Sequence, residues 1–383
     1  MFKRTIFSED HEMFRAQVRR FIETEIMPHH AQWEKDGRVS RETWLKAGEQ
    51  GLLCATVPEE FGGAGADFLF SMVVIEELAR VGAMGPGFSL HSDIVAPYLM
   101  HYGTEAQKRD WLPRMVRGEM IGAIAMTEPV AGSDVQGIKT TAVRDGDEYV
   151  INGQKVFITN GGNCDLLILA CKTDPSKGAK GISLILVPAA TPGFRKGKLL
   201  EKVGWKAQDT AELFFDDVRV PASNLLGVEN RGFYQLMEQL PQERLMQAVR
   251  ATSILEAALD WTVEYTSERK AFGGTISDFQ NTRFRLAEVR SQAVVMRVFT
   301  DHCMQMHTQG DLDSVDAAIA KMFTAESLCK SLDECLQLFG GYGYMWEYPI
   351  ARAWADARMS RIAGGTGEIM REIIGRQVLG GQR

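Results

Sequence analysis

The sequence predicts an α+β protein whose chain runs through helices, then strands, then helices. Residues 8–120 carry helical patterns with short breaks, and helical spacing returns from Gly232 to the C-terminus. Between them, residues 121–230 carry strand-like runs with no helical spacer of about 10–15 residues. This arrangement favours an antiparallel barrel or sandwich over βαβ units. We expect an N-terminal helical domain (1–120), a middle β domain (121–230) and a C-terminal helical domain (231–383).

The composition is that of a globular protein. Of the 383 residues, 45% are hydrophobic and 24% are charged, which excludes disorder as the main state. The net charge of -7 argues against a general nucleic-acid binder. The longest apolar runs, 166–171 and 182–188, have the length of strands, so we expect no membrane span.

The N-terminus and the cysteines indicate a reducing compartment. The first residues lack the apolar stretch of a secretory signal and turn acidic by Glu9. The six cysteines form no C-x-x-C pair, and the histidines form no H-E-x-x-H motif. We therefore expect reduced thiols, a cytoplasmic location and no metal site.

In the N-terminal region, helix signals and turn signals alternate. Ser8 is a candidate cap for a helix that runs to about Ile26 and ends at Pro28. A turn-rich stretch at 58–66 precedes helices near 69–81 and 104–117.

In the middle region, Asp145-Gly146 and Asn152-Gly153 are hairpin signals. Strand-like runs lie at 148–151, 155–159, 166–172, 182–188, 198–203 and 211–220. The region therefore predicts a sheet rich in hairpins.

In the C-terminal region, apolar residues between 277 and 309 recur at helical spacing. Helices of this length usually lie in bundles. The segment 240–245, Leu-Pro-Gln-Glu-Arg-Leu, has its proline where the first turn of a helix tolerates one. We expect a helix to begin there, with the charged pair Glu243-Arg244 near its start.

The common cofactor motifs are missing from the sequence. No G-x-G-x-x-G follows a strand, and no G-x-x-x-x-G-K-[ST] is present, so a Rossmann oxidoreductase is disfavoured. Five other features are unlike ordinary loops, and they lie at 125–134, 155–162, 240–245, 268–273, and 337–343 together with 362–369. Each alone could be a loop, a helix cap or a solvated surface, but their combination and order are specific.

Together these segments resemble the acyl-CoA dehydrogenase family of flavoproteins over essentially the whole chain. The similarity is greatest to the long-chain type, through 206–215 and the Gly-Tyr-Met-Trp-Glu-Tyr-Pro segment at 343–349. The family fold, a helical N-terminal domain, a middle β domain and a C-terminal four-helix bundle, agrees with the patterns above. The resemblance implies FAD as the cofactor, bound without a Rossmann unit, and a homotetramer built as a dimer of dimers.

The resemblance also implies which residues bind FAD. Around the flavin ring and the nearby pyrophosphate it places Met126, Thr127, Ser133, Phe157, Ile158 and Thr159, with Thr366 and Glu368 in the last flavin-contacting turn. Around the adenine half, partly across a subunit interface, it places Arg269, Phe272, Gln280, Gln337, Gly340 and Gly341.

The reaction that the resemblance implies is α,β-desaturation of an acyl-CoA thioester. A carboxylate removes a proton from Cα, and hydride leaves Cβ for flavin N5. Short- and medium-chain members carry the catalytic Glu immediately before the Gly-Thr of the last motif, where this chain has Gly364. Long-chain and isovaleryl members take the carboxylate from the Gln-Glu-Arg-Leu helix, where this chain has Glu243. We expect Glu243 to be the base and the Gly364 N–H to polarise the thioester carbonyl.

The resemblance implies further substrate contacts at Ser133, Lys180, Tyr234 and Arg244. Lys180 and Arg244 are candidate cations for the CoA phosphates, although an exposed loop lysine would have the same sequence signature. The expected substrate is a medium-chain, long-chain or branched acyl-CoA, and the expected electron acceptor is an electron-transfer flavoprotein.

Two alternatives remain open at this point. The same fold could act as an acyl-CoA oxidase or a flavin monooxygenase, because fold does not determine reaction. The chain could also be a non-catalytic protein that retains FAD and acyl-CoA, although a carboxylate still stands at one known base position.

Overall fold

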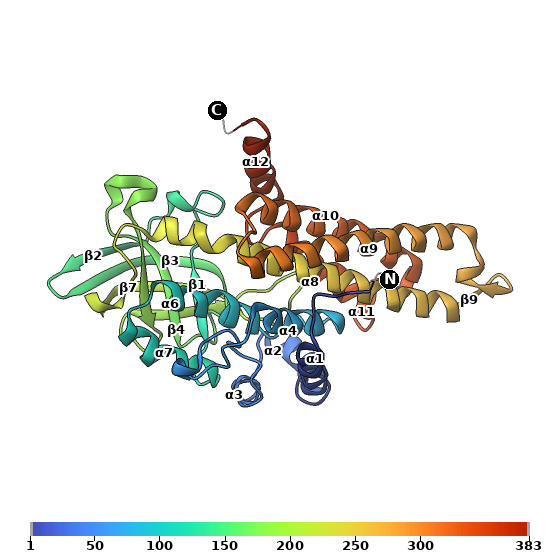
Figure 1. Ribbon diagram of the computed structural model, residues 1–383, viewed down its shortest axis with the longest axis horizontal. Coiled ribbons are helices and arrows are strands. Elements are labelled where there is room, and N and C mark those ends of the chain that lie inside the picture. Colours follow the sequence, from blue (N-terminus) through green and yellow to red (C-terminus); the bar gives the residue numbers. More distant parts are fainter. Residues whose placement is uncertain (1–2, 381–383) are drawn as a thin grey trace.

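Helices, a β-sheet and a second set of helices follow one another along the chain, in the predicted order (Figure 1). The computed structural model describes residues 3–380. The sheet lies at one end of the molecule, and the long C-terminal helices extend away from it. No helix within residues 3–380 is long and apolar enough to cross a membrane.

The N-terminal region is helical, as predicted. Its helices are α1 (Glu9–Phe21), a π-helical turn (Ile22–Ile26), α2 (Met27–Asp36), α3 (Arg41–Glu49), α4 (Phe68–Arg80), α5 (Phe88–Leu90), a second π-helical turn (His91–Val95), α6 (Ala96–Tyr102) and α7 (Glu105–Val116). Ser8 caps α1 by accepting a hydrogen bond from the His11 N–H.

The predicted helix end at Pro28 is wrong. The helix continues through the π-helical turn, and Pro28 lies in the first turn of α2 directly after it. The helix therefore passes Pro28 with one backbone hydrogen bond fewer. The helix ends instead at Gly37, whose φ of 69° is left-handed and favours glycine.

The middle region is a mostly antiparallel sheet. Its strands are β1 (Gly122–Ala125), β2 (Thr141–Asp145), β3 (Glu148–Thr159), β4 (Leu166–Lys172), β5 (Ile182–Pro188), β6 (Phe194–Leu199), β7 (Thr210–Pro221) and β8 (Leu225–Leu226). The order is β6-β7-β3-β2-β4-β5-β8, and β1 pairs with β4 in parallel. Strand β2 also pairs with β4 in parallel, at Thr141 and Lys172, so two strand pairs depart from the expected antiparallel pattern.

Of the two hairpin signals, only Asp145-Gly146 forms a hairpin, between β2 and β3. Asn152-Gly153 lies inside β3, where the pairing with β7 shifts register. A side chain at Gly153 would place its Cβ 2.5 Å from Oγ1 of Thr140, so close strand approach explains the glycine there. The strand expected at 198–203 lies earlier, at Phe194–Leu199.

The C-terminal region contains the longest helices. They are α8 (Gly232–Glu268), α9 (Gln280–Gln309) and α10 (Ser314–Phe339), followed by α11 (Pro349–Ala357) and α12 (Gly367–Val378). Helices α8, α9 and α10 pack against one another, and α11 packs on α8 and α10. A short hairpin, β9 (Lys270–Ala271) with β10 (Gly274–Thr275), joins α8 to α9.

The predicted start of a helix at Pro241 is wrong, because α8 begins at Gly232 and Pro241 lies inside it. Gly232 packs closely on Ser183 of β5, and Leu236 is fully buried in the N-terminal core. The free energy gained by burying this first stretch offsets the cost of the backbone hydrogen bond that an interior proline removes.

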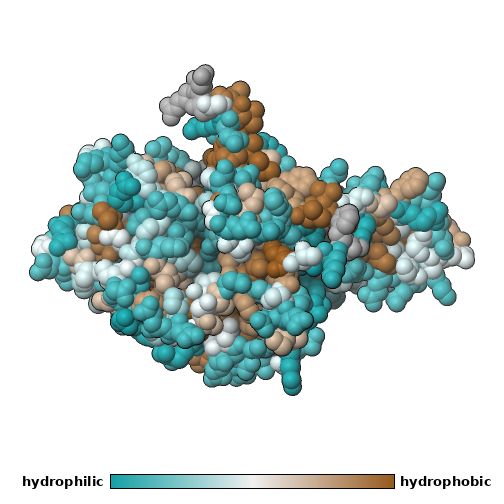
Figure 2. Space-filling view, in the orientation of Figure 1, coloured by the Kyte–Doolittle hydropathy of each residue, from teal (hydrophilic) through white to brown (hydrophobic). Residues whose placement is uncertain are grey.

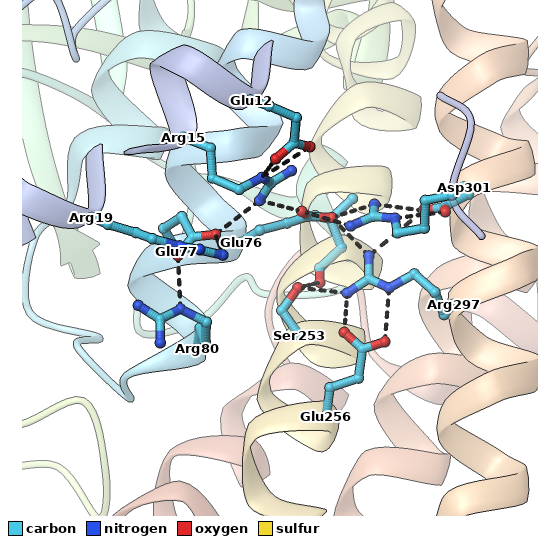
Figure 3. Close-up of polar contacts among 12 residues, drawn as sticks. Glu12, Arg15, Arg19, Glu76, Glu77, Arg80, Ser253, Glu256, Arg297 and Asp301 are labelled. Atoms are coloured by element: carbon cyan, nitrogen blue, oxygen red, sulfur yellow. Dashed lines mark hydrogen bonds and ion pairs between the residues drawn. The ribbon is translucent and has the colours of Figure 1, made fainter. Parts of the chain in front are cut away.

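A network of arginines and carboxylates joins the N-terminal helices to the C-terminal ones (Figure 3). Its centre is Glu76 of α4, which is 4% exposed. The Glu76 carboxylate forms ion pairs with Arg4, Arg15 and Arg297 at 2.7, 2.9 and 2.7 Å. Because α4 also packs on α8, the network helps to hold α8 against the N-terminal region.

Candidate active site

Glu243 lies on α8 and faces the N-terminal helices. Its side chain is buried, with 8% of the residue exposed, and the fully buried Tyr98 of α6 donates its hydroxyl to Glu243 Oε1 at 3.3 Å. Burial raises the pKa of the Glu243 carboxyl to about 7, although the Tyr98 hydrogen bond and the charge of Arg244 act in the opposite direction. A carboxyl with such a pKa is suited to accept a proton at neutral pH.

Arg244 makes its contacts with α10. Its Nη1 donates to the Ser314 hydroxyl at 3.4 Å, and its buried Nε has no partner among the described residues. Burial lowers the pKa of Arg244. Burial and the charge of Arg244 also lower the pKa of Lys321 to about 8, and Lys321 Nζ donates to the Gly365 carbonyl.

Gly364 lies against the same face of α8 as Glu243. A Cβ at Gly364 would lie 3.8 Å from Cγ of Gln247, and Gln247 follows Glu243 by four residues, one turn along the helix. The φ angles of Gly364 and Gly365 are +68° and +97°, which favour glycine. The two sequence positions considered for the base therefore converge on one site.

Residues expected around the flavin ring gather at one end of the sheet. The Val156 N–H donates to the Thr127 carbonyl at 3.0 Å, and Lys155 Nζ donates to the Met126 carbonyl at 2.8 Å. These bonds place Met126 and Thr127, just after β1, beside β3.

The side chains in this part of β3 point in different directions. A register shift between Lys155 and Ile158 turns Phe157 outward, with φ 61° and 66% exposure. Thr159 is half-buried, and Ser133 is exposed in the loop before β2. Ile158 is 2% exposed and packs in the sheet core, so only its backbone can contact a ligand.

Residues expected around the adenine half gather at the opposite end of the molecule, near the β9–β10 hairpin (Figure 1). The Arg269 guanidinium lies 5.3 Å from the centre of the Tyr342 ring. Phe272 is 97% exposed, and its ring centre lies 6.0 Å from that of Phe279. Gln280, at the start of α9, is exposed, as are Gln337, Gly340 and Gly341 around the end of α10.

The two groups of expected FAD residues lie apart within residues 3–380. Helix α8, whose 37 residues span about 55 Å at about 1.5 Å per residue, ends at the β9–β10 hairpin, away from the sheet (Figure 1). Thr366 caps α12 by accepting from the Ile369 N–H at 3.3 Å, and Glu368 in the first turn of α12 is exposed.

The remaining expected substrate residues lie near the start of α8. Lys180 is exposed in the turn between β4 and β5, and this turn contacts α8. Tyr234 is half-buried, with the Arg231 guanidinium 4.3 Å from the centre of its ring.

The structure also brings together residues that the sequence analysis did not single out. Tyr98 lies 145 positions from Glu243, and no sequence pattern links the two. Gln247 and Arg250 follow Glu243 at i+4 and i+7, a spacing that puts them on its helix face and that could have identified them.

Comparison with known proteins agrees with this arrangement. Residues 8–119, 123–218 and 230–379 match the acyl-CoA dehydrogenase N-terminal, middle and C-terminal domains. The chain is 52% identical over 378 residues to the long-chain specific acyl-CoA dehydrogenase, mitochondrial, of Mus musculus. The aligned residues cover 98% of this chain and 88% of that protein. The chain is 36% identical over 374 residues to the isovaleryl-CoA dehydrogenase, mitochondrial, of Pongo abelii, with 96% and 88% coverage.

Solved structures give the same result. The crystal structure of acyl-CoA dehydrogenase from Geobacillus kaustophilus superposes with a TM-score of 0.96 at 51% identity, covering 97% of this chain and 98% of that chain. Butyryl-CoA dehydrogenase from Megasphaera elsdenii gives a TM-score of 0.92 at 36% identity, with 98% and 100% coverage. The chain therefore belongs to the acyl-CoA dehydrogenase family of oxidoreductases and has the three-domain fold of that family.

Proposed function

We propose that this protein desaturates a medium-chain, long-chain or branched acyl-CoA to the trans-2-enoyl-CoA, with Glu243 as the base. The observation that carries the proposal is the buried Glu243 carboxyl, whose pKa burial raises to about 7, on the helix face that also meets Gly364. The similarity to the long-chain enzyme of Mus musculus supports the substrate class.

The residues present fit FAD, the cofactor on which the family depends. Phe157 offers an exposed aromatic face, Thr127, Thr159 and Thr366 offer neutral hydroxyls, and a Cβ at Gly341 would meet no atom within 4 Å. Neutral donors, aromatic surface and open glycine backbone suit a flat ring and a pyrophosphate. When bound, the flavin supplies the acceptor for the substrate hydride.

The chain's own residues have separate tasks in this reaction. Glu243 takes the proton from Cα, and burial keeps water from competing for it. The Tyr98 hydroxyl holds the Glu243 carboxyl in position through its hydrogen bond. We assign to the Gly364 N–H the role of polarising the thioester carbonyl, which stabilises the negative charge that develops there.

The experiment that tests the proposal is anaerobic titration of the FAD-loaded protein with acyl-CoA, followed by bleaching of the flavin absorbance. The Glu243→Gln variant is expected to retain FAD. Its rate of flavin bleaching is expected to fall by at least about 1,000-fold, because the base is removed. Glu264→Gln, the same change at an exposed position of the same helix, is the control and is expected to bleach normally. Unchanged bleaching in Glu243→Gln would remove Glu243 from the mechanism.

We further propose that electrons leave to an electron-transfer flavoprotein and that the protein works in the cytoplasm, where its six free cysteines stay reduced. Turnover with an artificial acceptor under nitrogen, with negligible peroxide in air, is the expected result. Stoichiometric peroxide would instead support an oxidase.

A further inference from the structure

Arg250 lies on the helix face that carries Glu243 and Gln247. It follows Glu243 by seven residues, two turns along α8, or about 10 Å at 1.5 Å per residue. The helix is buried on both sides of it, at 248–249 and 251–255, whereas Gln247 and Arg250 keep part of their surface accessible. Within the otherwise buried stretch 243–255, Gln247 and Arg250 are therefore the positions that keep accessible surface.

The contacts of Arg250 are all with neutral groups. Its Nη2 donates to the Ser89 hydroxyl at 2.8 Å, its Nη1 donates to Gln247 Oε1 at 3.1 Å, and its guanidinium lies 5.1 Å from the centre of the Trp205 ring. Arg250 forms no ion pair with any carboxylate within residues 3–380. This differs from Arg297 on α9, which pairs with Glu76 and Glu256.

Asp93, a carboxyl that is 5% exposed, favours the charged form of Arg250 through its own charge, without forming an ion pair with it. Burial raises the pKa of Asp93 to about 7, with Ser71 and Arg250 acting in the opposite direction. Burial lowers the pKa of Arg250 to about 10, so the guanidinium stays charged at neutral pH. A desolvated cation with only neutral partners would be stabilised by an incoming anion.

The order of sites along α8 gives the direction of a bound substrate. Tyr234 and the turn with Lys180 lie at the start of the helix, next come Glu243 and the adjoining Gly364, and Arg250 follows. When the CoA group lies near the start of α8 and the Cα atom of the substrate lies beside the Glu243 carboxyl, the acyl tail extends toward Arg250.

Resting on the proposed function, we propose that Arg250 is a specificity-determining residue that binds a carboxylate at the far end of the acyl group. The preferred substrates are then ω-carboxyacyl-CoA thioesters, long enough to reach from Glu243 to Arg250. A guanidinium binds a carboxylate through two parallel hydrogen bonds. A methyl end would instead remove water from the guanidinium without replacing the lost hydrogen bonds.

The first test compares matched substrates on the unaltered protein. Hexanoyl-, octanoyl- and decanoyl-CoA are paired with adipyl-, suberyl- and sebacyl-CoA, which have the same carbon number but a terminal carboxylate. For at least one pair, kcat/KM is expected to be about 10- to 100-fold higher for the carboxylated member, the range for a hydrogen bond to a charged group. Preference for the plain acyl-CoA in every pair would overturn the assignment.

The second test measures binding without turnover. In a Glu243→Gln background, dissociation constants are read from the flavin difference spectrum with Arg250 intact, with Arg250→Met and with Arg250→Lys. Arg250→Met is expected to abolish the preference for the carboxylated ligand, and Arg250→Lys to restore part of it. Arg195→Met, at an exposed strand position, is the control and is expected to leave the preference unchanged.

The outcomes separate this inference from the proposed function. If plain acyl-CoAs bleach the flavin and Arg250→Met leaves the ratio of dissociation constants unchanged, the inference on Arg250 fails alone. If no thioester of either kind bleaches the flavin, the proposed function fails.

Discussion

The surroundings of Glu243 determine when its carboxyl can act as a base. In the unfolded chain its pKa would be near 4.5, and burial raises it to about 7 in the folded protein. The acid is therefore neutral below pH 7 and becomes a base above it. The same shift destabilises the fold as pH rises from 4.5 to 7, because the unfolded chain ionises first.

Replacing Tyr98 is expected to move the pH dependence of the reaction. Tyr98→Phe removes the hydroxyl that donates to Glu243 and favours its charged form, so the pKa of Glu243 rises further. The rising limb of kcat/KM is expected to shift upward by about one pH unit. Tyr102→Phe is the control, because the Tyr102 hydroxyl donates instead to Glu238 at 2.7 Å; an equal shift in both variants would contradict the assignment.

The convergence of Gly364 and Glu243 on one helix face predicts that a base can be moved between them. In the Gly364→Glu variant the new Cβ would lie 3.8 Å from the nearest atom, so the backbone position has room for a side chain. The left-handed φ of this position costs a non-glycine residue about 1–2 kcal/mol of folding free energy. In a Glu243→Gln background this substitution is expected to restore part of the flavin bleaching and to lower the melting temperature by a few degrees. Gly364→Gln in the same background should restore none; equal bleaching in the two would show that the carboxylate is not the cause.

At the scale of elements, α8 organises the proposed site. It alone carries Tyr234, Glu243, Gln247 and Arg250, so their order is determined by one continuous helix. The N-terminal helices supply groups that face it, among them Tyr98 and Ser89. The relative position of α8 and the N-terminal region therefore decides whether the site is complete.

The ion-pair network around Glu76 is expected to be a large contributor to that packing. Glu76→Gln leaves the buried Arg15 and Arg297 and the half-buried Arg4 poorly compensated, and it is expected to lower the free energy of unfolding by about 3–5 kcal/mol. Glu12→Gln, whose side chain is 57% exposed at the edge of the network, should cost at most about 1 kcal/mol. Equal costs measured by urea denaturation would contradict a central role for Glu76.

The network also predicts how the protein responds to acid. Burial alone would raise the pKa of Glu76, but Arg297, Arg4 and Arg15 lower it from 4.5 to about 2. Because this pKa is lower in the folded state, the stability that Glu76 provides is full above pH 4.5 and is lost as pH falls toward 2.

At the scale of the molecule, the separation of the two FAD-binding groups supports an assembly of several copies. In one chain the sheet, whose strand β3 carries Phe157, and the β9–β10 hairpin, which contains Phe272, lie at different ends (Figure 1), so we propose that a second copy brings the two groups together. Exposed apolar side chains are consistent with such contacts, at Phe284, Val295 and Val298 on α9. Figure 2 shows further apolar surface on the projecting α12, whose last residue, Val378, is exposed, as is Leu379 directly after it.

We therefore expect a homotetramer in which FAD sites are shared between chains. Glu243→Gln and Arg269→Ala should each be impaired as homo-oligomers, the second through weaker FAD binding. After mixing and reassembly, a site formed by Glu243 of one chain and Arg269 of another is intact, so activity should reappear. A monomer by sedimentation, or no recovery in reassembled mixed oligomers, would contradict a shared site.

The sequence by itself was sufficient for the order of regions and for the expected base. Hydrophobic spacing and turn residues predicted the helix capped by Ser8 and the hairpin at Asp145-Gly146, because these signals act within a few residues. The motif containing Glu243 was recognisable for the same reason, since its residues are adjacent in the chain.

Only the tertiary structure decided features that depend on distant parts of the chain. Pro28 and Pro241 do not delimit helices where the local signals placed them, because the surrounding packing allows the helices to continue through a π-helical turn or an interior proline. The pKa of Glu243, its bond to Tyr98 and the neutral surroundings of Arg250 arise from side chains that folding brings together. Burial and long-range contact set these properties, and neither is encoded in the spacing of nearby residues.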